Sequence, residues 1–317
     1  MILSSPNDSS TTKVISWAKK LFPSAKIVKL CPANILQCSF SYEIGQKSFV
    51  FKQSENIVDL SDVSVIWCRK WYPEEILNEY RMNMPTSGVL SLKKHILQEF
   101  STFFDYLCYR LRDIFWLNHP RYVTPNKLIQ LTIAEEIGLT IPTSWILNHY
   151  SPQIKANDCI TKPLSNCCDV RINNTTYTNY TSELTGKESY DNLFVSYVQE
   201  NIPKEAEIRI FYLLGQCYAL LIHSQDNKKT QTDYRKYDYR HPNRLEPCKL
   251  PTIIESKIDT FMRKMNLQTG SLDFILTPDG EYVFLEVNPC GQYDIFNTCN
   301  IYPDKLIAEA LISKLKQ

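Results

Sequence analysis

Alternating apolar and polar residues predict a β-hairpin near the end of the chain. The stretch 271–288 reads SLDFILTPDGEYVFLEVN, with two runs rich in Phe, Ile, Val and Leu on either side of a Pro-Asp-Gly turn. We expect this turn to pair Thr277 with Tyr282, which places Asp273 opposite Glu286. One face of the hairpin is then wholly apolar and must lie on a core, through the pairs Leu272–Val287, Phe274–Leu285 and Leu276–Val283.

The polar face of this hairpin predicts a magnesium site. Asp273, Glu286 and Asn288 share that face, and like charges directly opposite each other on paired strands repel. A hard cation between their oxygens makes the pair favourable, and two carboxylates with an amide carbonyl suit magnesium that water and phosphate also hold. The alternative is a solvent-facing rim where two acids meet by chance. A one-residue bulge would also put the acids on opposite faces.

The rest of the pattern alternates between helix and strand, which predicts an α/β fold. We expect three parts: an N-terminal lobe over 1–118, a central lobe over 119–198 and a C-terminal lobe over 199–317. Helical periodicity marks 12–22, 91–115, 127–137, 249–265 and 306–315, and strand-length runs mark 27–30, 38–42, 48–52, 62–68, 159–164, 194–198 and 208–213.

Composition describes an ordinary globular protein and removes several classes of partner. Of the 317 residues, 44% are hydrophobic, and 35 basic against 34 acidic side chains leave no bulk charge that argues for nucleic acid or membrane. No run has the length of a membrane span and the start lacks a secretory pattern, so we expect a cytoplasmic protein. The 11 cysteines are scattered through apolar strings without a C-x-x-C pair, which argues against a zinc site.

Common nucleotide-binding and catalytic motifs are absent from the sequence. It has no G-x-x-x-x-G-K-[ST] and no G-x-G-x-x-G, which excludes a P-loop and a dinucleotide fold. With only eight glycines, phosphate binding has to rest on lysine, arginine and metal. The histidines show no ligand spacing, and there is no nucleophile elbow.

The end of the chain resembles the ATP-grasp fold. The string LEVNPCGQYDIFNTCNIYPDKLIAEALI begins at Leu285, and in that fold a D…E-x-N set binds the magnesium ions of ATP. The run N-P-x-G-Q-[FY], followed by C-N and a terminal helix, is similar to the branch that modifies ribosomally made peptides. These are the microviridin-type and grasp-with-spasm maturases, or graspetide ligases. Cys290 departs from the small aliphatic residue that is common there, and 294–296 match no feature of the family.

Two lysines match phosphate-binding positions of the fold. Lys127 begins the predicted helix 127–137, with Asn126 as its N-cap and Gly138 as its stop, and a cation there opposes the helix dipole unless an anion docks beside it. Lys162 lies in the strand 159–164, and the resemblance implies that it reaches the α-phosphate. The alternative for Lys127 is an ordinary surface lysine.

The hinge between lobes is the next part of the likeness. Strand 194–198 runs into Gln199, Glu200 and Ile202, where the resemblance implies that backbone groups read the adenine edge. Glu207 begins the following strand, and a carboxylate there can accept both ribose hydroxyls. The hinge signal is weak by itself because backbone recognition needs no particular side chain.

Three arginines match positions that contact phosphate or substrate. Arg209 shares the face of Glu207, and we expect it to contact the nucleotide and an acyl phosphate; the alternative is a cross-strand ion pair. Arg235 belongs to a D-[FY]-R element, and its planar guanidinium can hold the γ-phosphate and then the acyl phosphate. Arg244 is implied, by the match alone, to bind the substrate carboxylate.

The segment WCRKW, from Trp67 to Trp71, is similar to a W-x-R-[RK] element of the maturases. It predicts either a docking surface for an anionic or aromatic peptide, or two packed tryptophans whose basic neighbours reach solvent along their aliphatic stems.

The resemblance implies an ATP-dependent macrocyclising ligase that uses ATP and Mg²⁺. An Asp or Glu side chain of a ribosomal precursor peptide, recognised through its leader, becomes an acyl phosphate. A Thr or Ser hydroxyl, or a Lys amine, then displaces phosphate and gives an ω-ester or amide. Two alternatives stay open: a RimK-type ligase that adds amino acids to a peptide or protein tail, and a non-catalytic ATP- or peptide-binding protein. A homodimer is also left open.

Overall fold

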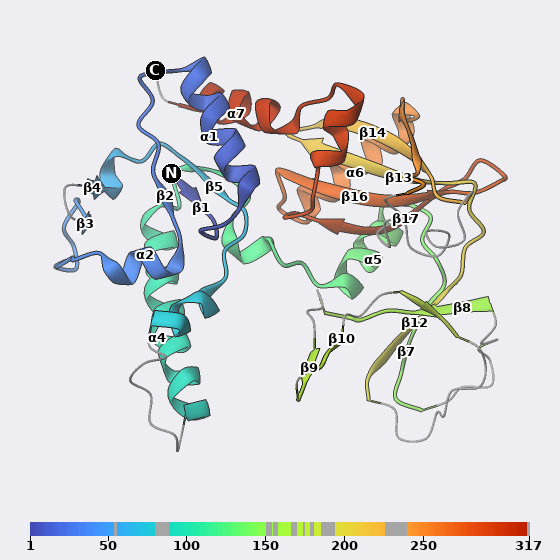
Figure 1. Ribbon diagram of the computed structural model, residues 1–317, viewed down its shortest axis with the longest axis horizontal. Helices are drawn as coiled ribbons and strands as arrows, with labels where there is room; N and C mark the ends of the chain where they lie inside the picture. The colour runs from blue at the N-terminus through green and yellow to red at the C-terminus, as the bar shows by residue number, and fades with distance from the viewer. Residues whose placement is uncertain are drawn as a thin grey trace. The chain divides into compact units, whose positions relative to one another are not determined.

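The computed structural model describes residues 1–53, 56–79, 89–149, 154, 158–165, 170–173, 175–177, 181–184, 194–225 and 240–315 (Figure 1). The chain divides into two compact units. In the sequence, the second unit is inserted between the two segments that form the first. Unit 1 comprises Met1–Val123 and Tyr302–Gln317, and unit 2 comprises Thr124–Ile301. Within the described ranges, no helix combines the length and the apolar character needed to cross a membrane. The three-lobe division expected from the sequence stays a prediction.

Unit 1 is built on a four-stranded parallel sheet in the order β2-β1-β5-β6. Parallel neighbours need crossover connections, and helices supply two of them here. The central strand reads VIWC and is buried at every position, as expected for a parallel strand that is covered on both faces. Its elements are β1 (Ile2–Leu3), α1 (Ser9–Leu21), β2 (Lys29–Leu30), α2 (Pro32–Gln37), β3 (Val50–Gln53), β4 (Asn56–Asp59), β5 (Val65–Cys68), α3 (Ile76–Glu79), α4 (Val89–Arg110), β6 (Phe115–Leu117) and α7 (Pro303–Ser313).

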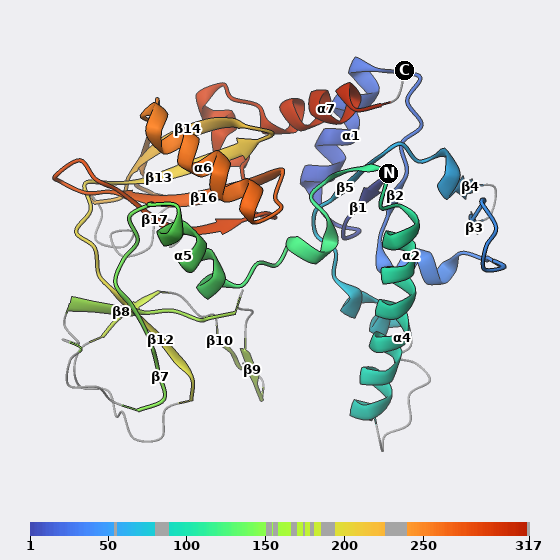
Figure 2. The same ribbon diagram turned by 180° about the vertical axis from the view of Figure 1, so that it is seen from behind.

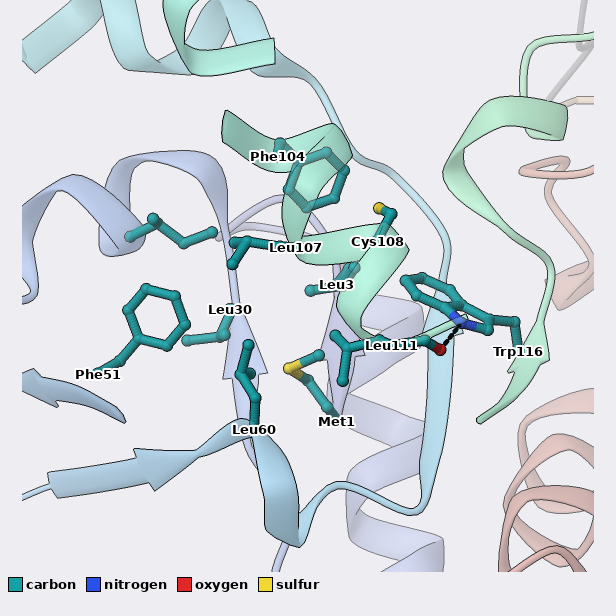
Figure 3. Close-up of a pocket in the computed structure, with 11 residues that line it drawn as sticks. Met1, Leu3, Leu30, Phe51, Leu60, Phe104, Leu107, Cys108, Leu111 and Trp116 are labelled. Atoms are coloured by element: carbon teal, nitrogen blue, oxygen red, sulfur yellow. Dashed lines mark hydrogen bonds between the residues drawn. The ribbon is translucent and has the colours of Figure 1, made fainter. Parts of the chain in front are cut away.

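The last helix, α7, returns to the N-terminal part of the chain and packs on α1 (Figures 1 and 2). Ile307 and Ala308 of α7 are buried, as are Val14 and Ala18 of α1. The core on the α4 side of the sheet is closely filled. Figure 3 shows side chains from β1, β2, β3 and α4 around a cavity of only about 10 Å³.

Two sequence-based expectations for unit 1 were wrong. The segment 38–42 is not a strand: a short helix, α2, ends just before it, and only Ser39 forms a bridge, to Lys52. The long helix expected over 91–115 ends at Arg110, and 115–117 form strand β6 instead. Its last residues are as apolar as the helix before them, so periodicity does not mark the boundary.

The WCRKW segment is packed inside unit 1. Trp71 stacks on Phe104 with ring centroids 4.4 Å apart. The Arg69 side chain is only 3% exposed, and its Nε lies 3.2 Å from Asp8, whose other oxygen lies 3.2 Å from Lys70. These contacts favour the packed-tryptophan interpretation over a docking surface. The structure differs from that interpretation in one respect, because Arg69 does not reach solvent but is buried in an ion pair with Asp8.

Unit 2 contains a five-stranded antiparallel sheet in the order β15-β14-β13-β16-β17. Helices α5 and α6 cover one face of it (Figure 2). Phe261 of α6 contacts Phe284, which contacts Phe274, so the apolar side of the predicted hairpin lies on these helices. The elements are α5 (Lys127–Glu136), β13 (Ala206–Leu213), β14 (Gln216–His223), β15 (Arg244–Cys248), α6 (Thr252–Lys264), β16 (Thr269–Leu276) and β17 (Tyr282–Asn288).

A second sheet of unit 2 has the order β11-β8-β12-β7. A separate hairpin, β9–β10, completes the described strands of this unit. The strands are β7 (Ser144–Leu147), β8 (Cys159–Thr161), β9 (Val170–Ile172), β10 (Thr175–Tyr177), β11 (Ser182–Glu183) and β12 (Ser196–Glu200).

The register of the β16–β17 hairpin agrees with the prediction at one end and differs at the other. Leu272 pairs with Val287, and Asp273 with Glu286, as expected. Toward the turn the register shifts by one residue, so that Phe274 pairs with Phe284, and Leu276 with Tyr282. The predicted pairs Thr277–Tyr282, Phe274–Leu285 and Leu276–Val283 were therefore wrong, because a β-bulge adds Leu285 to one strand. The bulge lies on the turn side of the acid pair, and the acids stay on one face.

Candidate active site

Three charged side chains stand side by side on the sheet face opposite the helices. Arg209 on β13 pairs with Asp273 on β16, which pairs with Glu286 on β17. Residues directly opposite each other on paired strands share a face, so the three side chains form a row across the sheet. Tyr212 of β13 points to the opposite face and donates a hydrogen bond to Asp259 of α6. The row of charged side chains therefore lies on the face that α6 does not cover.

The Arg209 guanidinium is held at both of its terminal nitrogens. Nη1 lies 2.6 and 2.7 Å from the two carboxylate oxygens of Asp273, and Nη2 donates to the backbone carbonyl of Gln292 at 2.9 Å. The side chains of this ion pair are only 8% and 16% exposed. The cross-strand ion pair that was the alternative reading of Arg209 therefore exists. Its burial separates it from exposed pairs, which contribute little to stability.

Lys127 connects α5 to the row of charges and to the end of β8. Its Nζ donates to the carbonyl of Pro163 at 3.0 Å and lies 3.4 Å from Glu286. Asn126 caps the helix as predicted, because its side chain accepts from the backbone N–H of Leu128 and Ile129. Lys127 is buried, which makes the ordinary surface lysine the weaker interpretation.

Lys162 directly precedes Pro163, whose carbonyl accepts the hydrogen bond from Lys127. Its Nζ lies 5.8 Å from the centre of the Tyr197 ring, on the neighbouring strand β12. Burial raises the pKa of the Tyr197 hydroxyl, and the charge of Glu286 adds to that effect. Lys127 contacts Glu286 directly and Lys162 lies beside Tyr197, and a common anion held by both lysines stays a prediction.

Two of the predicted hinge residues, Gln199 and Glu200, end β12, and Ile202 follows the strand. The Gln199 side chain is fully buried, and its Nε2 donates to the Tyr197 hydroxyl at 2.6 Å and to Ser144 Oγ at 3.1 Å. The Glu200 side chain accepts from the backbone N–H of Thr143. Ile202 is half-buried in the irregular segment that leads to β13. Adenine recognition by this segment stays a prediction.

Glu207 is the second residue of β13, and it lies two residues before Arg209 on the same face of the strand. Its Oε1 lies 2.5 Å from Lys204 Nζ and accepts from Ser224 at 3.2 Å. Burial raises the pKa of the Glu207 carboxyl, Lys204 lowers it, and the nearby charge of Asp273 raises it again. These two contacts are made by Oε1, so the other carboxylate oxygen of Glu207 can still accept a hydrogen bond from a hydroxyl group of a ligand.

The donor set on this face fits a magnesium ion. Asp273 and Glu286 are directly opposite each other, and Asn288 follows two residues later on the same face. Ser271 pairs with Asn288, and its buried Oγ has no hydrogen-bond partner within the part of the chain that the structure describes. Nowhere in the described ranges, this face included, do three His, Cys, Asp or Glu residues gather around one point, so protein carboxylates alone do not complete a shell. This suits a magnesium ion that phosphate and water also hold.

One predicted arginine lies away from this site in the structure, and another lies outside the described residues. Arg244 pairs with His223 on β14, whereas Ile222 pairs with Glu207, so Arg244 lies on the helix face of the sheet. There it contacts His223 at 3.0 Å and Glu246 at 3.3 Å. The structure therefore separates it from Arg209. Arg235 lies outside the described residues, and its role stays a prediction.

Two residues of the site region had no role in the sequence-based prediction. Gln130 Oε1 accepts from the backbone N–H of Val287 at 2.7 Å, which ties α5 to the strand that carries Glu286. Tyr197 connects Gln199, Ser144 and the Lys162 ammonium. Neither residue could be found from sequence spacing, because strand pairing and helix docking bring their partners together.

Comparison with known proteins gives matches only at the level of solved structures: no family model and no curated protein matches the chain. The macrocyclase MdnC from Microcystis aeruginosa MRC, bound with precursor peptide MdnA, is 26% identical with a TM-score of 0.80, and the match covers 98% of each chain. A RiPP-associated ATP-grasp ligase from Chryseobacterium gregarium, in complex with ADP and a leader and core peptide, is 23% identical with a TM-score of 0.84. That match covers 100% of this chain and 97% of the ligase.

A third similar structure is the ATP-grasp ligase PsnB, complexed with a phosphomimetic variant of its minimal precursor, Mg and ADP. It is 18% identical with a TM-score of 0.74, over 99% of this chain and 98% of that one. These matches extend over the whole chain and confirm the predicted α/β ATP-grasp fold with its N-terminal lobe. They also confirm the resemblance to ATP-grasp ligases and macrocyclases of ribosomally made peptides.

Proposed function

We propose that this ATP-grasp chain is a ligase that uses ATP and Mg²⁺ to macrocyclise a ribosomal precursor peptide. The observation that carries the proposal is the row Arg209, Asp273 and Glu286 across three strands, with Lys127 beside Glu286. It combines oxygen ligands and basic groups on one partly exposed face of the sheet, as a bound metal–triphosphate requires. The structural neighbours bind precursor peptides, and two of them also bind ADP, which supports the same chemistry here.

The proposed reaction has two steps. A side-chain carboxylate of the bound peptide attacks the γ-phosphorus of ATP, which gives an acyl phosphate and ADP. A hydroxyl or amine of the same peptide then attacks the acyl carbon, loses its proton and displaces phosphate, which leaves an ester or amide. Transfer of this kind depends on positioning and electrostatic stabilisation, so no covalent enzyme nucleophile is needed.

Each residue of the site has a part in this scheme. Asp273, Glu286 and Asn288 would hold magnesium, which neutralises phosphate charge when it is bound. Lys127 and Lys162 bind phosphate oxygens, and Glu207 accepts the ribose hydroxyls. Arg209 stabilises the charge that spreads over the transferring phosphoryl group, and its fixed fork suits that task. Arg235 would assist it from the segment outside the described residues.

The proposal places the protein in the cytoplasm, where ATP and newly made peptides are available. Every described cysteine is a free thiol, which is the expected state in that reducing compartment.

The test is intact-mass spectrometry of candidate precursor peptides from the same genome after incubation with the protein, ATP and magnesium. We expect the peptide to lose one water mass for each ring, with one ADP released. A gain in mass would instead indicate a ligase that adds amino acids to a tail, and ATP-dependent peptide binding without a mass change would indicate a binding protein.

A matched pair of variants connects that result to the site. Glu286→Gln should lower the rate of ring formation on the order of 100-fold, the loss typical when one electrostatic contact to a transition state is removed. Glu246→Gln is the control, because Glu246 is half-exposed and lies on the helix face of the same sheet. Equal activity of the two variants would remove Glu286 from the site.

A further inference from the structure

The turn that follows β17 lies directly against Arg209. Gly291 N donates to the carbonyl of Asn288 at 3.0 Å, and Cys290 N donates to the Asn288 side chain at 3.1 Å, so the turn is closed by two hydrogen bonds. The next residue, Gln292, supplies the carbonyl that accepts from Arg209 Nη2. The turn belongs to the run N-P-x-G-Q-[FY], whose likeness to the family motif assigns no function to Gly291.

Gly291 has no room for a side chain. A Cβ atom there would lie 2.9 Å from Arg209 Nη2, 2.9 Å from the Ser271 Cβ and 3.0 Å from the Asn288 carbonyl oxygen. Two of these neighbours belong to the framework of paired strands β16 and β17 and cannot move aside easily. Among the described glycines no other has a contact this short, and the backbone of Gly291 is not in the left-handed region. Close approach of the guanidinium and of the two strands, and not backbone conformation, explains this glycine.

The Arg209 side chain is therefore enclosed on three sides. Asp273 holds Nη1, the Gln292 carbonyl holds Nη2, and the Gly291 backbone lies against Nη2. The residue is 7% exposed. Each contact restricts a different movement of a planar group whose use in phosphoryl transfer depends on orientation.

We propose that Gly291 is a positioning residue for Arg209. Because it has no side chain, the Arg209 guanidinium can lie against its backbone, and this contact sets the plane of the guanidinium. This inference rests on the proposed function, since it concerns the arginine that acts on the transferring phosphoryl group there. A side chain at 291 would push Nη2 away from the Gln292 carbonyl and turn the fork relative to Asp273. The arginine would keep its charge and lose its orientation.

The variant Gly291→Ala tests the proposal in the full-length chain. We expect kcat for ring formation to fall on the order of 100-fold, as for a misplacement of about 1 Å at a reacting centre, with KM for ATP nearly unchanged. In an Arg209→Lys background the same change should have little further effect, because the group that Gly291 positions is gone. A full additional loss in that background would overturn the proposal.

Gly270→Ala is the matched control for simple damage to the sheet. A Cβ at Gly270 meets Val287 Cγ2 at 3.2 Å, the Pro289 Cα at an ordinary contact distance of 3.4 Å and the Met262 methyl at 3.5 Å, and none of its near contacts is with Arg209. It should lower stability and leave kcat unchanged. If Gly291→Ala does not fold, Ser271→Gly combined with Gly291→Ala removes the collision with the Ser271 Cβ and keeps the contacts with Nη2 and the Asn288 carbonyl. The combined variant should also lose kcat, and normal kcat in it would count against the proposal.

A readout that does not need catalysis separates this inference from the proposed function. In protein with isotope-labelled arginine, the held guanidinium should give a resolved, slowly exchanging N–H signal that Arg209→Lys removes. Gly291→Ala should broaden or shift that signal, and Gly270→Ala should not. If the wild type forms no rings but the signal behaves in this way, the proposed function fails and the positioning role stands. If rings form and Gly291→Ala changes neither kcat nor the signal, the positioning role fails.

Discussion

Three acidic side chains on one face of the five-stranded sheet each have a basic partner. Asp273 has Arg209, Glu286 has Lys127, and Glu207 has Lys204, all on one face of one sheet. An unpaired charge in such a place would cost several kcal/mol, so each pair offsets part of the cost of burying its two groups. The same oxygens and nitrogens are the groups that the proposed reaction uses. Pairing within the fold therefore holds these side chains in place for the substrate.

The strongest test of this pairing lies away from the site, at Asp8. Asp8 is 3% exposed, and it contacts Arg69, Lys70 and the Ser4 hydroxyl. Asp8→Asn leaves Arg69 buried without a counterion, and we expect it to destabilise unit 1 by about 3–5 kcal/mol. Urea unfolding followed by tryptophan fluorescence measures this. Asp113→Asn is the control, since that side chain is 87% exposed.

Asp8 also predicts a dependence on pH. Burial alone would raise the pKa of Asp8, but Arg69 and Lys70 outweigh it and hold the pKa below its usual value. The native state then binds fewer protons than the unfolded chain, so stability falls as the pH drops through the range of carboxylate titration, below about 4. Asp8→Asn should lack this part of the acid sensitivity. An unchanged slope between wild type and variant would contradict the pairing.

At the scale of elements, alternation predicted the important half of the hairpin. The face that carries Asp273 and Glu286 follows from apolar residues at every second position, and the structure has that pair. The bulge at Leu285 was not predictable, since Leu285 fits the alternation as well as its neighbours do. Likewise, sequence motifs predicted Lys127 and Lys162 separately. The hydrogen bond from Lys127 to the Pro163 carbonyl, which joins their two segments, forms only in the folded chain and could not be predicted.

The contact between α5 and β17 predicts that a side chain of α5 stabilises the edge strand β17. β17 is an edge strand, and its Val287 N–H is paired by Gln130 Oε1, while its Phe284 N–H is paired by the Thr140 carbonyl. Gln130→Ala leaves a buried N–H unpaired and should cost about 1–3 kcal/mol of stability. Hydrogen exchange at Val287 should quicken as well. Gln46→Ala, in an exposed turn of unit 1, is the control, and equal losses from the two would contradict this role.

At the scale of the whole molecule, sequence motifs predicted the fold better than they predicted its connections. The N-P-x-G-Q run and the terminal helix indicated an ATP-grasp protein, and the solved structures confirm that fold. The amphipathic pattern of 306–315 predicted a helix but could not name its partner, because any apolar surface satisfies such a stripe. The structure gives α1 as that partner, so the chain ends in the unit in which it began.

This return of the chain predicts that α7 stabilises unit 1 selectively. Ile307 is 1% exposed between α1 and β5, and Lys305 lies 5.8 Å from the Trp17 ring of α1. Ile307→Ala should cost about 2–5 kcal/mol through the lost burial and the cavity that it leaves. Hydrogen-exchange mass spectrometry should show faster exchange in α1 and β5 and unchanged protection in β16 and β17. Glu309→Ala, exposed on the same helix, should change neither set. Faster exchange spread evenly over both sets of strands would mean that the two units unfold together, and that α7 supports the active-site sheet as much as it supports the sheet of unit 1.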